Sequence, residues 1–187
     1  MNLDIIDYTW IFVAVVWLAA AFRTKQPVRQ YSGAARAVQI VLLVLAVMLL
    51  FVRRVQMGYL GTRLFPPSNI AYTIGVVLLF AGVLFAFWAR FFLGRNWSGE
   101  ITVKQDHQLI RSGPYALVRH PIYSGFIFAM LGTAIAFGQL RGFLGVVLAA
   151  IGWRLKSLIE ERYMVEQFGA EYTNYKQSVK ALVPFIW

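Results

Sequence analysis

The sequence of 187 residues contains no cysteine and few charged residues. Without cysteine, disulfides, thiolate metal sites and cysteine nucleophiles are excluded. Charged residues make up 14% of the chain and hydrophobic residues 59%, whereas soluble domains carry about 25% charge and about 45–50% apolar residues. Helices in lipid tolerate this composition because they satisfy their own backbone hydrogen bonds and need no polar outer face. The composition therefore predicts an all-α membrane protein.

Negative charge is especially scarce, with 8 acidic residues against 18 basic ones and a net charge of +10. Such an excess can indicate a nucleic-acid partner, but here the basic residues lie between apolar runs and form no stripe interleaved with aromatic residues. We therefore expect no nucleic-acid partner. The start of the chain lacks a basic segment followed by a small-residue cleavage site, so we expect the first apolar run to be retained as an anchor.

Five apolar runs are predicted to cross the bilayer as helices. They are Ile5–Phe22, Ala37–Val52, Ile70–Ala89, Ile122–Phe137 and Phe143–Ile159. A bilayer core needs about 20 apolar residues per helix, so the short second run spans it if Arg36 and Arg53 snorkel from its ends. The pattern predicts a polytopic protein with one membrane domain, residues 1–187, and a lipid-bilayer partner.

The domain is predicted to have two parts. Residues 1–93 form a three-helix scaffold, in which small residues such as Gly75 allow close helix packing. Residues 94–187 form the functional part. Within it, the short 138–142 connection predicts a tight antiparallel hairpin over 122–159, and amphipathic helices follow at the C-terminal end.

The positive-inside rule predicts the orientation. With the N-terminus outside, fourteen basic residues fall in the inner segments and four in the outer ones. The inner ones are Arg23, Lys25, Arg29, Arg36, Arg90, Arg95, Lys104, Arg111, Arg119, Arg154, Lys156, Arg162, Lys176 and Lys180, and the outer ones are Arg53, Arg54, Arg63 and Arg141. The C-terminus and the 94–121 segment should therefore face the cytoplasm.

Polar residues become distinctive after residue 94, where both histidines, His107 and His120, occur. Pro114 and Pro121 predict turns that lead into a helix starting near Pro121. A helix start presents unpaired N–H groups and the positive end of a dipole, which suits an anionic or acceptor-rich ligand.

The hairpin should bring the end of the fifth run back beside His120. That end carries Arg154, Lys156, Glu160 and Glu161. Two charged clusters facing each other at the membrane margin indicate a functional site. The structural alternative is that these charges are solvated and mark the membrane interface. Farther on, Phe168, Tyr172 and Tyr175 recur on one helical face, and Gly169 predicts a turn between two helices.

The ordered residues of this half resemble the isoprenylcysteine carboxyl methyltransferase family, over roughly Gly94 to Pro184. The pattern is His107-x-Leu-Ile-x-x-Gly113-Pro-Tyr115-x-x-x-Arg119-His120-Pro121-x-Tyr123-x-Gly125, followed by Glu160-Glu161 and Phe168-Gly-x-x-Tyr172-x-x-Tyr175. The resemblance implies methyl transfer from S-adenosyl-L-methionine, in a cytoplasm-facing pocket, to a lipophilic or prenylated acceptor. The expected acceptor group is the carboxylate of an isoprenylcysteine or a similar thioether.

The resemblance, together with the charges of the residues, gives a predicted set of cofactor-binding residues. They are His107, Gln108, Leu109, Ile110, Gly113, Tyr115, Arg119, His120, Pro121, Ile122, Tyr123, Glu160 and Glu161. Glu160 or Glu161 is expected to hold the cofactor ammonium, Arg119 or His120 its carboxylate, and Tyr115, Leu117 and Tyr123 its adenine.

Lys156 and Arg154 are the predicted catalytic residues on the acceptor side. In the prenylcysteine enzymes an arginine occupies the position of Lys156, four residues before the first glutamate. Lysine keeps the charge but lacks the planar fork that suits a carboxylate, which leaves the acceptor open. Transfer to a carboxylate needs positioning but no base and no metal, whereas an amine acceptor needs a base such as His120 or a glutamate.

Two other functions remain open. Sterol-type membrane reductases share the Arg-His-Pro-x-Tyr motif and bind NADPH. A non-catalytic membrane scaffold is the other alternative. Thermal unfolding would distinguish the three functions. S-adenosylmethionine should stabilise a methyltransferase, NADPH should stabilise a reductase, and neither ligand should stabilise a scaffold.

Overall fold

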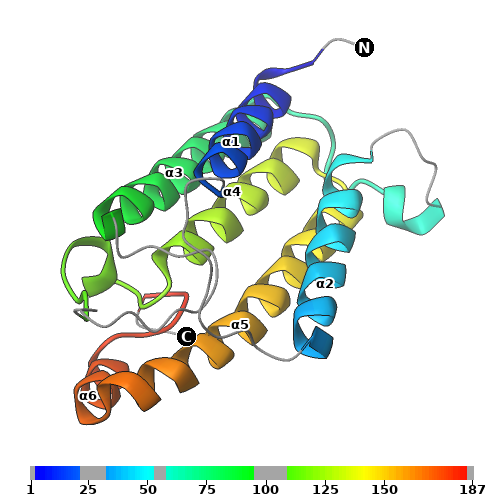
Figure 1. Cartoon of the computed structure of the whole chain (residues 1–187). Helices are drawn as coiled ribbons and strands as arrows, with labels where there is room; N and C mark the ends of the chain where they lie inside the picture. Colours follow the sequence, from blue (N-terminus) through cyan, green and yellow to red (C-terminus); the bar gives the residue numbers. More distant parts are fainter. Residues whose placement is uncertain (1–2, 22–32, 53–57, 95–108, 185–187) are drawn as a thin grey trace.

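A computed structural model describes residues 3–21, 33–52, 58–94 and 109–184, and their regular structure is helical apart from one isolated β-bridge. The helices are α1 (Ile5–Ala21), α2 (Gly33–Phe51), α3 (Asn69–Leu93), α4 (Pro121–Phe137), α5 (Leu140–Phe168) and α6 (Ala170–Ser178), with 3₁₀ turns η1 (Gly58–Gly61) and η3 (Gly113–Ala116). Figure 1 shows α1 to α5 as a bundle, with α6 at the end farthest from the N-terminus.

The five predicted apolar runs all form helices, α1 to α5. Of these, α2, α3 and α5 are long and apolar enough to cross a membrane, while α1 and α4 are apolar with 17 residues each. Helix α2 begins at Gly33, so Arg36 lies inside its first turn, and Arg53 lies outside the described residues. Helix α5 continues nine residues beyond its predicted end at Ile159, because it runs to Phe168. The charged residues from Arg154 to Glu161 are therefore carried on a continuous helix.

Helices α3 and α4 pack closely because glycines face each other at two levels. A Cβ atom on Gly82 would lie 2.5 Å from the carbonyl oxygen of Gly125, and a Cβ atom on Gly75 would lie 2.5 Å from that of Gly132. The predicted packing role of Gly75 is confirmed. The first turn of α4 lies at the candidate site, so these glycine contacts fix the position of that turn relative to α3.

Helix α5 packs against both α4 and α2. Gly138, in the left-handed conformation with φ 64°, ends α4, and α5 begins two residues later, so the predicted hairpin is confirmed. Against α2, Gly145 approaches the Ala46 backbone, where a Cβ atom would lie 2.8 Å from the carbonyl oxygen. Buried Ala46, Leu50 and Ala149 fill this interface.

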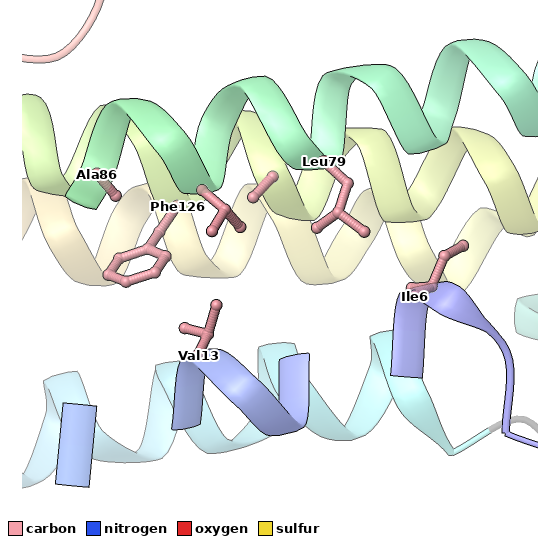
Figure 2. Close-up of a cluster of buried hydrophobic side chains, with 7 residues drawn as sticks. Ile6, Val13, Leu79, Ala86 and Phe126 are labelled. Atoms are coloured by element: carbon pink, nitrogen blue, oxygen red, sulfur yellow. The ribbon is translucent and has the colours of Figure 1, made fainter. Parts of the chain in front are cut away.

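Helix α1 is attached to the bundle by side chains that reach toward α3 and α4. Figure 2 shows Ile6 and Val13 of α1 facing Leu79, Ala86 and Phe126 in one buried cluster. Besides these apolar contacts, the indole N–H of Trp10 donates to the hydroxyl of Thr133, at 3.0 Å. Thr133 is fully buried.

Removing this hydroxyl should loosen α1. We expect Thr133→Val to destabilise the protein by about 1–3 kcal/mol, because the partly buried Trp10 N–H loses its acceptor. A lower thermal midpoint in detergent micelles would measure the effect. Thr9→Val is the matched control, since the Thr9 hydroxyl bonds to Ile5 O within its own helix. Equal midpoints for the two variants would contradict a tertiary role for the Trp10–Thr133 bond.

The two ends of the bundle differ in charge. At the hairpin end, the amides of Leu64 and Leu140 donate to the carbonyls of Gly138 and Thr62, and the buried Arg141 donates to the Val52 carbonyl. Arg63 and Arg141 are the described basic residues at this end. The described basic residues at the opposite end are Arg36, Arg90, Arg111, Arg119, Arg154, Lys156, Arg162, Lys176 and Lys180. The candidate site lies at this second, strongly basic end.

Candidate functional site

The beginning of α4 is covered by residues 179–182, which we call the C-terminal strap. The amides of Arg119 and His120 donate to the carbonyls of Lys180 and Ala181, at 2.8 and 3.0 Å, and the Ser124 hydroxyl donates to Leu182 O. Pro121 has no N–H and stands at the first helical position, as predicted. The amides of Arg119 and His120, which precede the first turn of α4, are therefore bound by the strap, and the predicted ligand at the first-turn amides stays a prediction.

Arg119 joins α5, α6 and the strap. Its Nε and Nη2 atoms donate to Glu161 Oε1 at 3.1 and 2.7 Å, and its Nη1 atom donates to the carbonyls of Lys176 and Val179. Those carbonyls lie at the C-terminal end of α6, where a cation is favourable. The Arg119 and Glu161 side chains are 7% and 3% exposed. Arg119 is therefore engaged in a buried ion pair.

His120 lies between the two glutamates. Its Nε2 atom is 3.2 Å from Glu161 Oε1 and its Nδ1 atom is 3.4 Å from Glu160 Oε2. Burial lowers the pKa of His120, but hydrogen bonds to Glu160 and Glu161 raise it more, and the net pKa lies above the ordinary 6.5. The predicted meeting of His120 with the glutamates is confirmed.

The two adjacent glutamates have different environments. Glu161 also contacts Lys176 Nζ, at 3.1 Å, and is almost fully buried. Glu160 is 21% exposed, accepts a hydrogen bond from the Tyr123 hydroxyl at 2.6 Å and lies 3.7 Å from Lys156 Nζ. Glu160 is therefore the more accessible of the two glutamates.

A stack of rings connects the site with the hydrophobic core. The Tyr123 ring lies nearly parallel to His120, with centroids 5.5 Å apart, and to Trp153, with centroids 6.2 Å apart. Trp153 also stacks on Phe126, a member of the core cluster. Lys156 Nζ lies 5.5 Å from the centre of the Tyr123 ring. The Tyr123 ring therefore packs against His120 and Trp153, and its packing against an adenine stays a prediction.

One face of α5 supplies most of the site. Lys156 and Ser157 follow Trp153 by three and four residues, and Glu160 and Glu161 follow it by seven and eight, the spacing that places side chains on one side of a helix. Arg154 lies beside this face, and its Nη1 atom donates to the Ser157 hydroxyl at 3.0 Å. Two residues were predicted for the acceptor side. The Lys156 ammonium lies 3.7 Å from the Glu160 carboxylate, whereas the Arg154 guanidinium donates a hydrogen bond to Ser157 of the same helix.

The predicted residues before the α4 start mainly pack the end of the bundle. Tyr115 is buried in η3, and its carbonyl accepts a hydrogen bond from the Tyr175 hydroxyl. Burial raises the pKa of both phenols above the ordinary 10. Gly113 has φ 59° and lies against the Phe92 ring, where a Cβ atom would be 2.7 Å away.

The remaining predicted residues are divided between described and undescribed parts of the chain. Leu109 and Ile110 are half-buried, and Leu117 is 49% exposed. His107 and Gln108 lie outside the described residues. Pro121 and Ile122 form the first turn of α4.

Three parts of the site were not predicted. Trp153 had a usable signal, because it precedes Lys156 and Glu160 by one and two helical turns. Lys176 and the C-terminal strap had none, because Lys176 reaches Glu161 from a different helix and the strap contacts join residues 58 or more positions apart. Gly169, with φ 55°, separates α5 from α6 as predicted, and Tyr172 and Tyr175 of α6 are buried, whereas Phe168 belongs to α5.

A bundle of apolar helices with a cluster of paired carboxylates and cations at one end defines an integral membrane protein with a polar site near the membrane surface. The family comparison agrees with this class. The chain belongs to the phospholipid methyltransferase family, whose model matches residues 70–171.

Curated relatives support the resemblance that the motifs indicate. The chain is 31% identical over 124 residues to the protein-S-isoprenylcysteine O-methyltransferase of Saccharomyces cerevisiae, covering 64% of this chain and 51% of the relative. It is 33% identical over 117 residues to the Rattus norvegicus protein of the same name, covering 60% and 40%. The predicted likeness to isoprenylcysteine carboxyl methyltransferases is confirmed. The chain spans about half the length of these relatives.

A solved structure supports the fold. The structure of a eukaryotic intramembrane Ras methyltransferase, isoprenylcysteine carboxyl methyltransferase, matches with a TM-score of 0.60 and 23% identity. The match covers 85% of this chain and 55% of that one. The all-α polytopic membrane fold predicted from composition is therefore confirmed.

Proposed function

We propose that the protein transfers a methyl group from S-adenosyl-L-methionine to the carboxylate of a lipid-like acceptor, such as an isoprenylcysteine or a similar thioether. The observation that carries this proposal is the partly exposed Glu160 beside Lys156, at the membrane-surface end of α5. Membership in a methyltransferase family and the named relatives support it.

The residues at the site fit the amino-acid end of this cofactor. When bound, S-adenosylmethionine supplies an electrophilic methyl group on a sulfonium and carries an ammonium that needs an anionic partner. Glu160 would hold that ammonium, because it is partly exposed and already oriented by Tyr123 and His120. Glu161 and Arg119 are buried against each other, so Glu160 is the better ammonium ligand.

The protonation pattern of the site favours a carboxylate acceptor over an amine. An amine must be neutral to attack, and it therefore needs a base nearby. Among the described groups at the site, both glutamates are ion-paired and His120 lies between two carboxylates. A carboxylate is already ionised, and Lys156 would pair with it. Phospholipid amines, which the family description suggests, are the second candidate acceptor.

The apolar part of the acceptor would lie in the bilayer beside α5. Leu155 and Leu158, adjacent in sequence to Lys156 and Ser157, are 40% and 39% exposed on the outer side of this helix. Such a surface next to a charged site accommodates a molecule with a polar head and a long hydrocarbon tail.

We further propose that the site faces the cytoplasm and the N-terminus the opposite side. The described basic residues support this orientation, since two lie at the hairpin end and nine at the site end. Labelling of single cysteines placed at Ser68 and at Asn174 with a membrane-impermeant reagent tests it. The reagent should label position 68 in intact cells, and it should label position 174 only after the cells are lysed.

The proposed reaction is tested with purified protein. S-adenosylhomocysteine should raise the thermal midpoint and NADPH should not, and a co-bound nucleoside should be identified by mass spectrometry. A farnesyl thioether with a free carboxylate should accept a radiolabelled methyl group, while its amide should not. Methyl transfer to phosphatidylethanolamine would favour an amine acceptor. A thermal midpoint raised by NADPH alone would favour a reductase, and a midpoint that no ligand changes would favour a non-catalytic scaffold.

Two neighbouring substitutions should separate cofactor binding from acceptor use. We expect Glu160→Gln to weaken S-adenosylhomocysteine binding at least about tenfold, because a charge-assisted hydrogen bond is worth about 1.5–3 kcal/mol. Lys156→Ala should instead raise the acceptor KM and change cofactor affinity less than about twofold. Titration calorimetry and initial rates measure the two effects. Unchanged cofactor affinity in Glu160→Gln would contradict the assignment of Glu160.

A further inference from the structure

His120 has an unusual position, because each of its ring nitrogens faces a different carboxylate. Nε2 lies 3.2 Å from Glu161 Oε1 and Nδ1 lies 3.4 Å from Glu160 Oε2, with the side chain 10% exposed. A neutral imidazole carries one N–H and one lone pair, so it donates to one carboxylate and turns a lone pair toward the other. The doubly protonated ring donates to both. Carboxylates beside both ring nitrogens therefore favour the imidazolium.

The two glutamates can hold one ring between them because they are adjacent on α5. Successive residues of a helix point about 100° apart, so the two carboxylates diverge and the ring fits between them. Other groups then hold each glutamate from its far side. Glu161 contacts Arg119 before α4 and Lys176 of α6, with Tyr172 of α6 nearby, whereas Glu160 contacts Tyr123 of α4 and Lys156 of α5.

We propose that Glu161 is a positioning residue, which holds His120 as a charged bridge so that His120 orients Glu160 toward the ammonium of the cofactor. This inference rests on the proposed function, in which Glu160 binds that ammonium. The sequence led us to expect that either glutamate binds the cofactor. In this proposal the two glutamates have different roles: Glu160 binds the cofactor and Glu161 positions His120. Glu161 is 3% exposed and paired with Arg119 and Lys176, while Glu160 is 21% exposed and available to a ligand.

The bridge predicts how the site responds to pH. In the wild type, the raised pKa of His120 keeps the ring charged as pH rises past its ordinary value of 6.5. In Glu161→Gln, one of the two carboxylates that raise this pKa is replaced by a neutral amide, while burial continues to lower it. The pKa of the ring is then lower than in the wild type, so the ring loses its proton at lower pH and Glu160 loses a charged donor.

The first measurement reads the charge of His120 directly. The sequence contains two histidines, so selective ¹³C labelling gives two ring signals by NMR, and His120→Asn assigns them. From about pH 5.5 to about pH 8, the range in which an ordinary histidine titrates, the wild-type His120 signal should stay closer to its imidazolium shift than that of a model histidine. In Glu161→Gln it should titrate. A wild-type His120 that titrates like a model histidine would overturn the bridge.

The second measurement tests the link to the cofactor. Between the same two pH values, S-adenosylhomocysteine affinity should change less than about twofold in the wild type and fall about tenfold in Glu161→Gln, the loss of one charged hydrogen bond. Glu171→Gln, in the exposed pair with Arg111, is the matched control and should behave as the wild type. A loss in Glu161→Gln that is equal at both pH values would show damage to the fold instead of positioning.

These measurements distinguish failure of the inference from failure of the proposed function. If His120 stays charged in the wild type but the wild-type protein does not bind S-adenosylhomocysteine, the cofactor assignment fails while the imidazolium bridge stands. If the analogue binds and the pH dependence of Glu161→Gln matches that of the wild type, the positioning role fails while the proposed function stands.

Discussion

Replacing Arg119 with methionine is expected to destabilise the protein by about 3–5 kcal/mol, the range for removing one partner of a buried ion pair. Methionine leaves the Glu161 carboxylate without the two N–H donors of the guanidinium, at a position where it is 3% exposed. The carbonyls of Lys176 and Val179 lose their donor as well. Equilibrium unfolding in mixed micelles, followed by circular dichroism, measures the change.

A surface ion pair of the same chemistry is the control for this variant. Arg111 pairs with Glu171 at 3.1 Å, but both side chains are about half exposed, so Arg111→Met should cost no more than about 1 kcal/mol. Adding Glu161→Met to Arg119→Met should recover part of the loss, because the buried charge is then absent. If the two arginine variants lost the same free energy of unfolding, the buried Arg119–Glu161 pair would stabilise the protein no more than the exposed pair does.

Gly82→Leu should strongly disrupt the packing of α3 against α4. A Cβ atom at residue 82 would lie 2.5 Å from the Gly125 carbonyl oxygen and 2.5 Å from the Ala129 nitrogen, both backbone atoms that cannot move aside alone. Helices α3 and α4 must therefore separate, and we expect a loss of about 3 kcal/mol or more. The thermal midpoint and the yield of monodisperse protein measure it.

Gly33 offers the matched control for this effect. It lies in the first turn of α2, and a Cβ atom there would meet no atom within 4 Å. Gly33→Leu should change stability by less than about 0.5 kcal/mol, as expected for a surface position. If Gly82→Leu were as stable as Gly33→Leu, the close contact of α3 with α4 would be wrong.

The helices could be predicted from sequence because the chain contains long apolar runs with few alternatives for their secondary structure. The meeting of His120 with Glu160 and Glu161 could also be predicted, since a short connection forces the fourth and fifth helices to run antiparallel. Both conclusions depend on local patterns and on one tight turn.

The difference between Glu160 and Glu161 could not be predicted in the same way. The two residues are adjacent and chemically identical, and Glu161 is buried because Arg119 and Lys176 approach it from other elements. The strap over the α4 start likewise depends on contacts such as Ser124 with Leu182, 58 positions apart. No periodicity in the sequence records these contacts, because they arise from how the elements pack.

The length of α5 links the site to the thickness of the membrane. Glu160 lies 20 residues after Leu140, the first residue of this helix, and at about 1.5 Å per residue the distance is about 30 Å, the thickness of a typical hydrocarbon core. At the other end, buried Arg141 is bound to the Val52 carbonyl and anchors α5 to α2. A thicker bilayer therefore draws the glutamates toward hydrocarbon unless α5 tilts less, so hydrophobic mismatch acts directly on the charge state of the site.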